Sequence, residues 1–95
     1  MKYLEELNFS PDAIAEILDD TPDKILALLE EQKKLVSENI NYLRDLGVKN
    51  YQEIFIRYYD MFLLDNSNFK DIFEKYDPED LVAKLEKNIN IVEFL

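Results

Sequence analysis

The stretch ENINYLRDLGVKN, residues 38–50, decides the fold, because it contains a helix end, a stop signal and the next helix start. The apolar residues of its first half recur at three-residue steps, which is typical of one face of a helix. Gly47 follows this face, and glycine ends helices readily because it adopts the left-handed conformation without a steric penalty. Asn50 stands three residues before Glu53, the spacing of a capping box. The stretch therefore predicts a junction between two helices.

Proline marks three further helix starts, each in a frame of capping residue, proline and acid. The three frames are Ser10-Pro11-Asp12, Thr21-Pro22-Asp23 and Asp77-Pro78-Glu79. The first side chain can cap free amides of a first turn, proline needs no N–H partner there, and the acid suits the positive helix end. Two more starts are expected, one at Asn90 from its spacing to Glu93 and one at Ser67 or Asn68.

The composition favours an all-α fold in a single domain, residues 1–95, with about six or seven short helices. The chain has one glycine, whereas antiparallel hairpins and barrels usually need several for their turns. Its apolar content of 47% is that of a folded chain. Residues 22–46 fit either one long helix or two helices that break near the EEQKK run at 30–34.

Targeting signals are not found in the sequence. No apolar run follows a basic segment near the first residues, so no signal peptide is expected. The most apolar stretch, residues 54–64, contains Arg57 and Asp60 and is not a membrane span. The chain has no cysteine, which fits a reducing compartment. We therefore expect a cytoplasmic protein without a membrane segment.

The pattern L-x-x-L-[NG]-[FV] occurs twice, at residues 4–9 and at residues 43–48. The interval of about forty residues is in the range of helical solenoid repeats. The sequence thus predicts one unit over about 3–42, a second over about 43–91 and the start of a third at 92–95. Such units stack on their neighbours, because none covers its own apolar face.

The first unit resembles the repeat of the mitochondrial transcription termination factor (mTERF) family, LG(F/V)-S-x-x-(E/D)-I-x-x-I-L-x-x-x-P-x-L-L followed by a helix ending in (I/V)-x-(F/Y)-L-x-x-L-G. The matching positions are Ile14, Ile17, Leu18, Pro22, Leu26, Ile40, Tyr42, Leu43, Leu46 and Gly47. The second unit is looser, since Ile54 comes one residue late and the motif proline is absent. The resemblance implies three-helix repeats stacked in a left-handed superhelix, with nucleic acid bound along a basic concave surface. This chain departs from the family by being shorter and strongly acidic.

The residues that usually carry catalysis are missing. The chain has no histidine and no cysteine, which removes the commonest general base, the best nucleophile and most zinc chemistry. One glycine is too few for a phosphate-binding loop. The carboxylate pairs Asp19-Asp20 and Glu79-Asp80 are ordinary at helix ends in so acidic a chain. We expect no enzymatic activity, no cofactor and no metal site.

Eight of the twelve aromatic residues lie between positions 51 and 76. Helical spacing assigns these apolar residues to the core: Phe55, Phe62, Phe69, Ile72 and Phe73. Tyrosine is enriched at interfaces, because its ring is apolar and its hydroxyl needs water or a partner. Tyr51, Tyr58 and Tyr59 do not all face one core, so we expect at least two to line a protein-binding surface. The apolar end at Phe94 and Leu95 is a second place for a protein partner or another copy of the chain.

The charge of −10 favours basic partners and opposes nucleic-acid binding, which depends on Lys and Arg at phosphates. In the mTERF-like interpretation, five basic residues form a strip that contacts the phosphates of a nucleic acid: Lys33, Lys34, Arg44, Lys49 and Arg57. In the other interpretation they pair with nearby acids, as Glu30 with Lys34 at i, i+4.

The sequence therefore favours a non-enzymatic acidic helical-repeat module that binds a protein partner. Basic proteins are among the candidates for that partner. Three alternatives stay open. They are nucleic-acid binding as in mTERF-like proteins, a nucleic-acid-mimicking inhibitor of phage or mobile-element type, and a homodimer that closes the solenoid ends.

Overall fold

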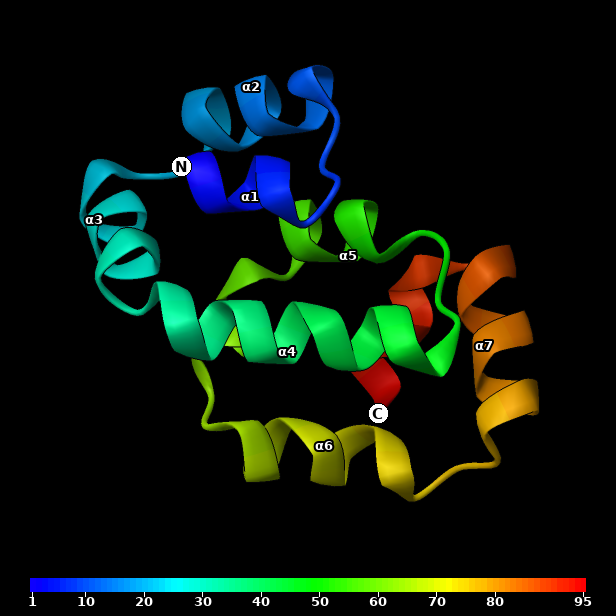
Figure 1. The fold of residues 1–95 in the computed structure, drawn as a ribbon. Helices are drawn as coiled ribbons and strands as arrows, with labels where there is room; N and C mark the ends of the chain where they lie inside the picture. The colour runs from blue at the N-terminus through cyan, green and yellow to red at the C-terminus, as the bar shows by residue number, and fades with distance from the viewer.

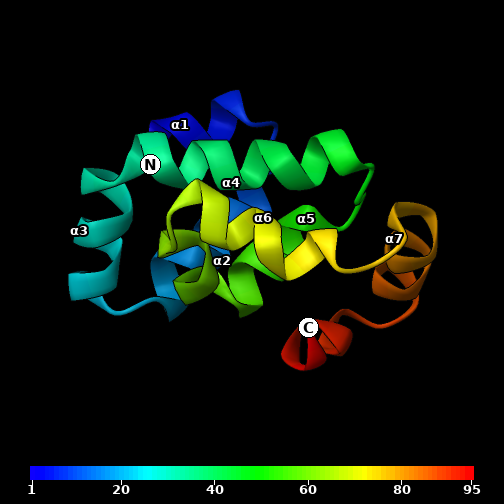
Figure 2. The same ribbon diagram turned by 90° about the horizontal axis from the view of Figure 1, so that it is seen from below.

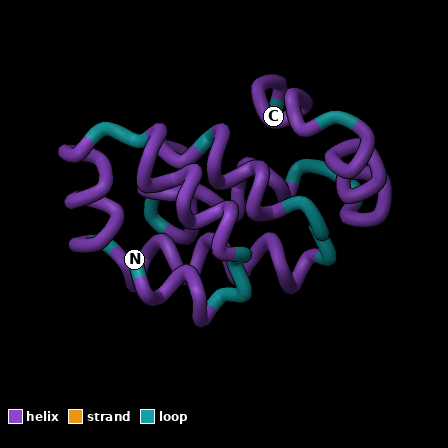
Figure 3. Tube along the Cα trace, turned by 90° about the horizontal axis from the view of Figure 1, so that it is seen from above, coloured by secondary structure: helices purple, strands orange, loops and turns teal.

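The computed structural model describes residues 1–95 and is entirely helical, which confirms the all-α prediction. The elements are α1 (Lys2–Glu6), α2 (Pro11–Asp20), α3 (Asp23–Glu31), α4 (Lys33–Leu46), α5 (Tyr51–Arg57), η1 (Tyr59–Leu63), α6 (Asn66–Glu74), α7 (Pro78–Lys87) and η2 (Ile89–Phe94), where η marks a 3-10 helix. Figure 1 shows α4 crossing the molecule, with α5 on one side and α6 on the other. The connections between helices are short (Figure 3). No helix has the length and apolar content that a membrane crossing requires.

All three proline frames start helices as predicted, and two of them have the predicted side-chain cap. The Ser10 hydroxyl accepts a hydrogen bond from the Ala13 N–H at 3.1 Å, and proline is the first residue of α2. The Asp77 carboxylate accepts from the Asp80 N–H at 3.1 Å, again with proline as the first residue of α7. Each cap satisfies an amide that a first helical turn leaves free.

The predicted cap at Thr21 is wrong, because this residue ends α2 and does not cap α3. Its backbone is extended and its N–H bonds to the Ile17 carbonyl at 3.1 Å. α3 begins after Pro22 without a side-chain cap. The open question about residues 22–46 is answered by a break at Gln32, so that α3 and α4 are separate helices.

Helix starts in the second half are displaced from the predicted residues. α6 is capped by Asp65, whose carboxylate accepts from the Asn68 N–H at 3.0 Å, so neither Ser67 nor Asn68 is the cap. η2 is capped by Asn88, whose side chain accepts from the Asn90 N–H at 3.0 Å. The prediction of Asn90 as a cap is therefore wrong by two residues, because the nearer asparagine takes the capping position.

α5 begins directly after Asn50, as predicted, but Asn50 makes no capping bond. Its side-chain amide instead donates to the Leu85 carbonyl of α7 at 2.9 Å. This contact, 35 residues away in sequence, orients the side chain, and the Oδ1 atom that would accept a capping bond has no hydrogen-bond partner. This bond joins the α4–α5 junction to α7.

Gly47 ends α4 in the left-handed conformation, with φ of 98°, as predicted. Its N–H bonds to the Arg44 carbonyl at 3.1 Å, and the Val48 N–H bonds to the Leu43 carbonyl at 3.1 Å. This pair of bonds defines a Schellman motif, in which the last carbonyls of a helix find partners.

Asn8 ends α1 in the same way, with φ of 66°. Its N–H bonds to the Glu5 carbonyl at 3.0 Å, and the Phe9 N–H bonds to the Leu4 carbonyl at 3.0 Å. Asparagine tolerates this conformation better than other non-glycine residues. The two copies of L-x-x-L-[NG]-[FV] are thus two Schellman motifs of the same hydrogen-bond pattern.

One hydrophobic core of 19 buried residues receives side chains from every helix. A row of phenyl rings runs through it, from Phe9 to Phe55, Phe62, Phe69 and Phe73, with successive ring centroids 5.5, 5.0, 5.0 and 5.1 Å apart. The predicted core phenylalanines are all buried, whereas Ile72 is half-buried against them. Edge-to-face and tilted ring pairs of this kind add to the burial of apolar area.

The chain folds into a body of 35 × 26 × 23 Å with a radius of gyration of 12.7 Å. A compact domain of this length has a radius of gyration of roughly 12 Å. The first three helices lie at one end of this body, and α7 with η2 lies at the other (Figures 1 and 2).

Candidate functional site

The outer face of α2 carries four carboxylates and no basic residue. These residues, Asp12, Glu16, Asp19 and Asp20, are all exposed. Their spacing places them within one side of the helix, next to the side that buries Ala13 and Ile17. We call these four residues the acidic face of α2.

The negative charge of the protein is concentrated around this face. Residues 1–32 contain nine acidic and two basic residues, and so they hold seven of the ten net negative charges. These residues form α1, α2 and α3, which lie together at one end of the molecule (Figure 2). The other two thirds of the chain are therefore close to electrical balance.

A cleft of about 410 Å³ lies between α2 and α5, next to the acidic face. Asp12 and Glu16 line it from α2, and Glu53 lines it from α5. Lys49 is the one basic residue of the lining, and the apolar residues Ala13 and Ile56 also line the cleft. It therefore offers both carboxylates and apolar contact, and we call it the acidic cleft.

Side-chain hydrogen bonds hold the two walls of the acidic cleft together. The Gln52 carbonyl oxygen accepts from the Ser10 N–H at 3.0 Å, and its amide donates to the Asn8 carbonyl at 3.1 Å. The Tyr51 hydroxyl donates to the Leu7 carbonyl at 2.8 Å. α5 is thus bonded to the segment that joins α1 to α2, which fixes the shape of the cleft before any partner arrives.

The three tyrosines predicted to line a partner surface lie at separate places. Tyr51 is half-buried, with its hydroxyl bonded as described and its ring 5.5 Å from that of Phe9. Tyr59 is half-buried against the core. The Tyr58 hydroxyl donates to the Glu93 carboxylate at 3.2 Å, where burial and this carboxylate raise the tyrosine pKa. The structure therefore joins Tyr58, and not the other two, to the C-terminal segment.

The two residues of the predicted apolar end differ, since Phe94 is exposed and Leu95 is half-buried against the core. The side chain of Phe94 is 84% exposed, more than any other large hydrophobic residue. A cleft of about 170 Å³ lies beside it, between α7 and η2. Its lining residues are Tyr76, Asp80, Leu81, Lys84, Ile91, Phe94 and Leu95. We call it the C-terminal cleft.

The five basic residues proposed for phosphate contact are not gathered into one hollow. Lys33 and Lys34 line a hollow of about 360 Å³ near α1, Lys49 lines the acidic cleft, and Arg57 lies in the last turn of α5. The guanidinium carbon of Arg44 lies 5.7 Å from the centre of the Tyr51 ring.

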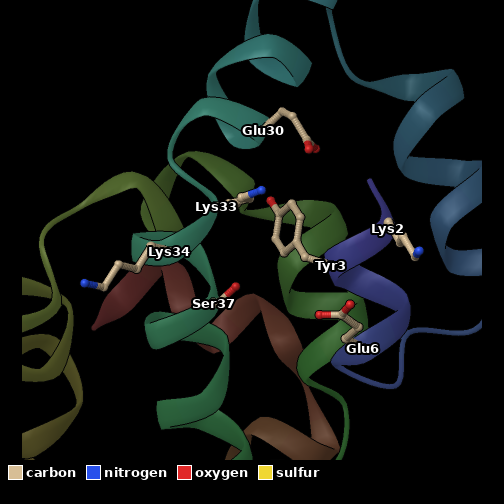
Figure 4. Close-up of a pocket in the computed structure, with 7 residues that line it drawn as sticks. All are labelled: Lys2, Tyr3, Glu6, Glu30, Lys33, Lys34 and Ser37. Carbon is tan, nitrogen blue, oxygen red and sulfur yellow. The ribbon is translucent and has the colours of Figure 1, made fainter.

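The hollow near α1 has mixed charge (Figure 4). Lys2 and the two lysines of α4 share it with Glu6 and Glu30. The Lys33 side chain extends toward Tyr3, while Lys34 points away. The Tyr3 hydroxyl donates to the Leu29 carbonyl at 2.9 Å, and its burial raises the tyrosine pKa.

The expected pairing of Glu30 with Lys34 is wrong, because the break at Gln32 puts these residues on different helices. Only one ion pair is present, between the Lys84 ammonium and the Asp80 carboxylate at 3.0 Å on α7. The other basic residues are thus not neutralised by a carboxylate in direct contact. No group of three or more acidic side chains is arranged to hold a metal ion.

The acidic face of α2 was not among the predicted site residues, although its signal is present in the sequence. The segment PDAIAEILDD contains four acids and no base, but its carboxylates were predicted only as the acid of a proline frame, Asp12, and as an ordinary pair at a helix end, Asp19-Asp20. Comparison with known proteins gives no further guide, since no family model, no curated protein and no solved structure matches the chain.

Proposed function

We propose that this protein is a non-enzymatic helical module that binds a basic protein partner through the acidic face of α2 and the acidic cleft. The separation of charge carries the proposal, because seven of the ten net negative charges lie in the first 32 residues. A surface of one charge sign attracts a partner of the opposite sign and orients it during approach.

The acidic cleft suits lysine and arginine side chains. Asp12, Glu16 and Glu53 supply carboxylates for the charged head groups. Ala13 and Ile56 supply apolar contact for the methylene groups that precede the head groups. Arginine fits such a site well, because its planar head group makes two parallel bonds to a carboxylate.

The architecture that we propose is a pair of mTERF-like helical units over residues 3–42 and 43–91, with the start of a third at 92–95. The shared Schellman motifs at Asn8 and Gly47 support it, since each ends a helix with the same hydrogen-bond pattern. In this proposal the protein shares the helical unit of the family and not its basic binding surface.

Mimicry of nucleic acid is a second candidate that one observation favours. Three carboxylates of the acidic face, Asp12, Glu16 and Asp19, follow one side of α2 at axial steps of about 6 and about 4.5 Å, from the rise of 1.5 Å per residue. A row of negative charges is the feature that basic grooves of nucleic-acid-processing proteins bind. The partner would then be a protein of that class.

The test compares capture of proteins from a native lysate by the wild type and by the triple variant Asp12→Asn, Glu16→Gln, Asp19→Asn. We expect basic proteins to bind the wild type and to be lost from the variant. The affinity of an identified partner should fall as salt is added, because exposed charges are screened. A nuclease or polymerase among the captured proteins would favour mimicry.

A matched control removes three charges elsewhere, in the variant Glu38→Gln, Asp71→Asn, Glu74→Gln. These residues are exposed on α4 and α6, outside the acidic face. The control should keep the partner, since only the total charge changes. Equal loss of binding in both variants would show that net charge alone matters. Salt-sensitive binding of the wild type to nucleic acid would favour the family-like activity.

A further inference from the structure

Phe94 is the most exposed large hydrophobic residue of the protein, and it lies outside the acidic face of α2. Its ring is 84% exposed, and the C-terminal cleft lies directly beside it. The volume of this cleft, about 170 Å³, matches one aromatic ring, since an apolar cavity of about 150 Å³ holds a benzene molecule. Five of its seven lining residues are apolar or aromatic. One surface thus carries both a protruding ring and a recess of ring size.

A surface that carries both a protruding ring and a recess suits a dimer with two-fold symmetry. In a symmetric dimer the same surface of each copy must be complementary to itself, so that a protruding group on one fits a recess on the other. We propose that two copies of this chain associate through the C-terminal cleft, each placing the phenyl ring of Phe94 in the cleft of the other. Tyr76, Leu81 and Ile91 form the recess.

The charges at the C-terminal cleft are also self-complementary. Its only charged lining residues are Asp80 and Lys84, one turn apart on α7 and paired at 3.0 Å within the chain. When two such helices meet antiparallel, the acid of one lies opposite the base of the other. The pair is more than half exposed, so both groups are free to exchange partners.

The end of the molecule at α7 and η2 is less acidic than the first three helices, since residues 76–95 carry a net charge of −3 and residues 1–32 carry −7. Two chains at −10 repel each other, but the first 32 residues carry most of that charge, and they lie at the far end of a body 35 Å long. Repulsion between exposed charges decays over about 8 Å at physiological salt. Contact through α7 and η2 therefore leaves the most negative part of each chain outside the interface.

The segment that presents Phe94 is held in place. Val92 is buried in the core, and the Tyr58 hydroxyl bonds to Glu93, the residue before Phe94. Asn88 caps the start of η2. The ring is thus presented from a fixed backbone, which lowers the ordering cost of association.

Sedimentation velocity over micromolar to millimolar concentrations tests the proposal on the full chain. The wild type should pass from monomer to dimer as concentration rises. Phe94→Ala should weaken the dimer by at least about tenfold, because buried aromatic anchors dominate interface energies. Leu18→Ala is the matched control, since Leu18 is also exposed, at 47%, but lies on α2. It should leave the dimerisation constant unchanged, and circular dichroism should show equal helix content in all three proteins.

A charge-reversal mixture tests the two-fold arrangement separately. Asp80→Lys and Lys84→Glu each place like charges across the axis, so each variant alone should dimerise less than the wild type. A mixture of the two should form heterodimers, because both cross-axis contacts then join opposite charges. A wild type that stays monomeric to millimolar concentration would overturn the proposal. So would a Phe94→Ala variant with wild-type association, or a mixture that associates no better than its components. None of these results bears on the acidic face, where the proposed basic partner binds.

Discussion

Asn66 donates its side-chain amide to the side-chain oxygen of Asn39 across 3.0 Å, and so joins the start of α6 to the middle of α4. Asn39 is fully buried, and its own amide donates to the carbonyls of Phe62 and Leu64 at 2.9 and 2.8 Å. The Asn39 side chain thereby satisfies two carbonyls at the end of η1, where the backbone makes few helical hydrogen bonds of its own. The packing of η1 and α6 against α4 depends on this network.

Asn39→Ala should therefore lower the free energy of unfolding by about 2 to 4 kcal/mol, because two carbonyls and the Asn66 amide lose their partner. Urea denaturation followed by circular dichroism measures the change. Asn41→Ala on the same helix is the control, since Asn41 is exposed, and it should cost less than about 0.5 kcal/mol. Equal effects of the two variants would contradict the role assigned to Asn39.

Phe62 lies between two other rings of the aromatic row and is fully buried. Phe62→Ala should cost about 3 to 5 kcal/mol, since it removes a large buried ring and leaves a cavity. That loss is a large part of the total expected for 95 residues, about 5 to 14 kcal/mol. Phe94→Ala makes the same change at an exposed site and should leave the stability of the dilute monomer unchanged. A small effect at Phe62 would mean that the row is not the centre of the core.

Gly47 allows a test of backbone strain alone, because an added Cβ at this position has no atom within 4 Å. Gly47→Ala should cost about 1 kcal/mol, the penalty of the left-handed conformation for a residue with a side chain. Gly47→Asn should cost less, as Asn8 adopts this conformation at the end of α1. Thermal denaturation of the two variants gives the order, and the reverse order would show that φ is not the cause.

Alkaline pH should destabilise the protein. Burial is the main cause that raises the pKa of Tyr3, Tyr42 and Tyr58 above the ordinary value of 10.0, with neighbouring carboxylates adding to it. Above pH 10 the unfolded chain releases these protons and the folded chain keeps them, so the free energy of unfolding falls as pH rises. For the buried Tyr3 the slope approaches about 1.4 kcal/mol per pH unit, and its contribution is fully present below pH 10.

Urea denaturation at several pH values between 8 and 11 measures this slope. Tyr3→Phe should reduce it, because Tyr3 is the most buried of the three tyrosines. Tyr76→Phe changes an exposed tyrosine and should leave the slope as it is. Lysines also titrate in this range, so a slope that Tyr3→Phe leaves intact would assign the effect to them.

Local signals in the sequence predicted the elements that local bonds make. The caps at Ser10 and Asp77 and the helix stop at Gly47 depend on residues within one turn, and each was predictable. The aromatic core was predictable as well, since apolar residues at helical spacing turn inward together. One exception is the stretch after Arg57, where the same spacing continues but the helix gives way to η1.

Contacts distant in sequence explain what could not be predicted. Asn50 has the spacing of a capping box, but the Leu85 carbonyl takes its amide. Asn39 looks like a surface residue in the sequence, and its burial follows from carbonyls 23 and 25 residues away. The same limit applies to the C-terminal cleft, since Phe94 was predictable as apolar and the recess beside it depends on how η2 packs on α7.

The uneven charge, −7 on residues 1–32 and −3 on the rest of the chain, gives the molecule a permanent electric dipole whose negative pole lies on the side of α1, α2 and α3. In the field of a basic partner the protein rotates until its negative pole leads, before the two surfaces touch. Added salt should therefore slow association more than it speeds dissociation. In the proposed two-fold dimer the dipole components perpendicular to the axis cancel, while each copy keeps its own acidic face, so that one pair can bridge two partners.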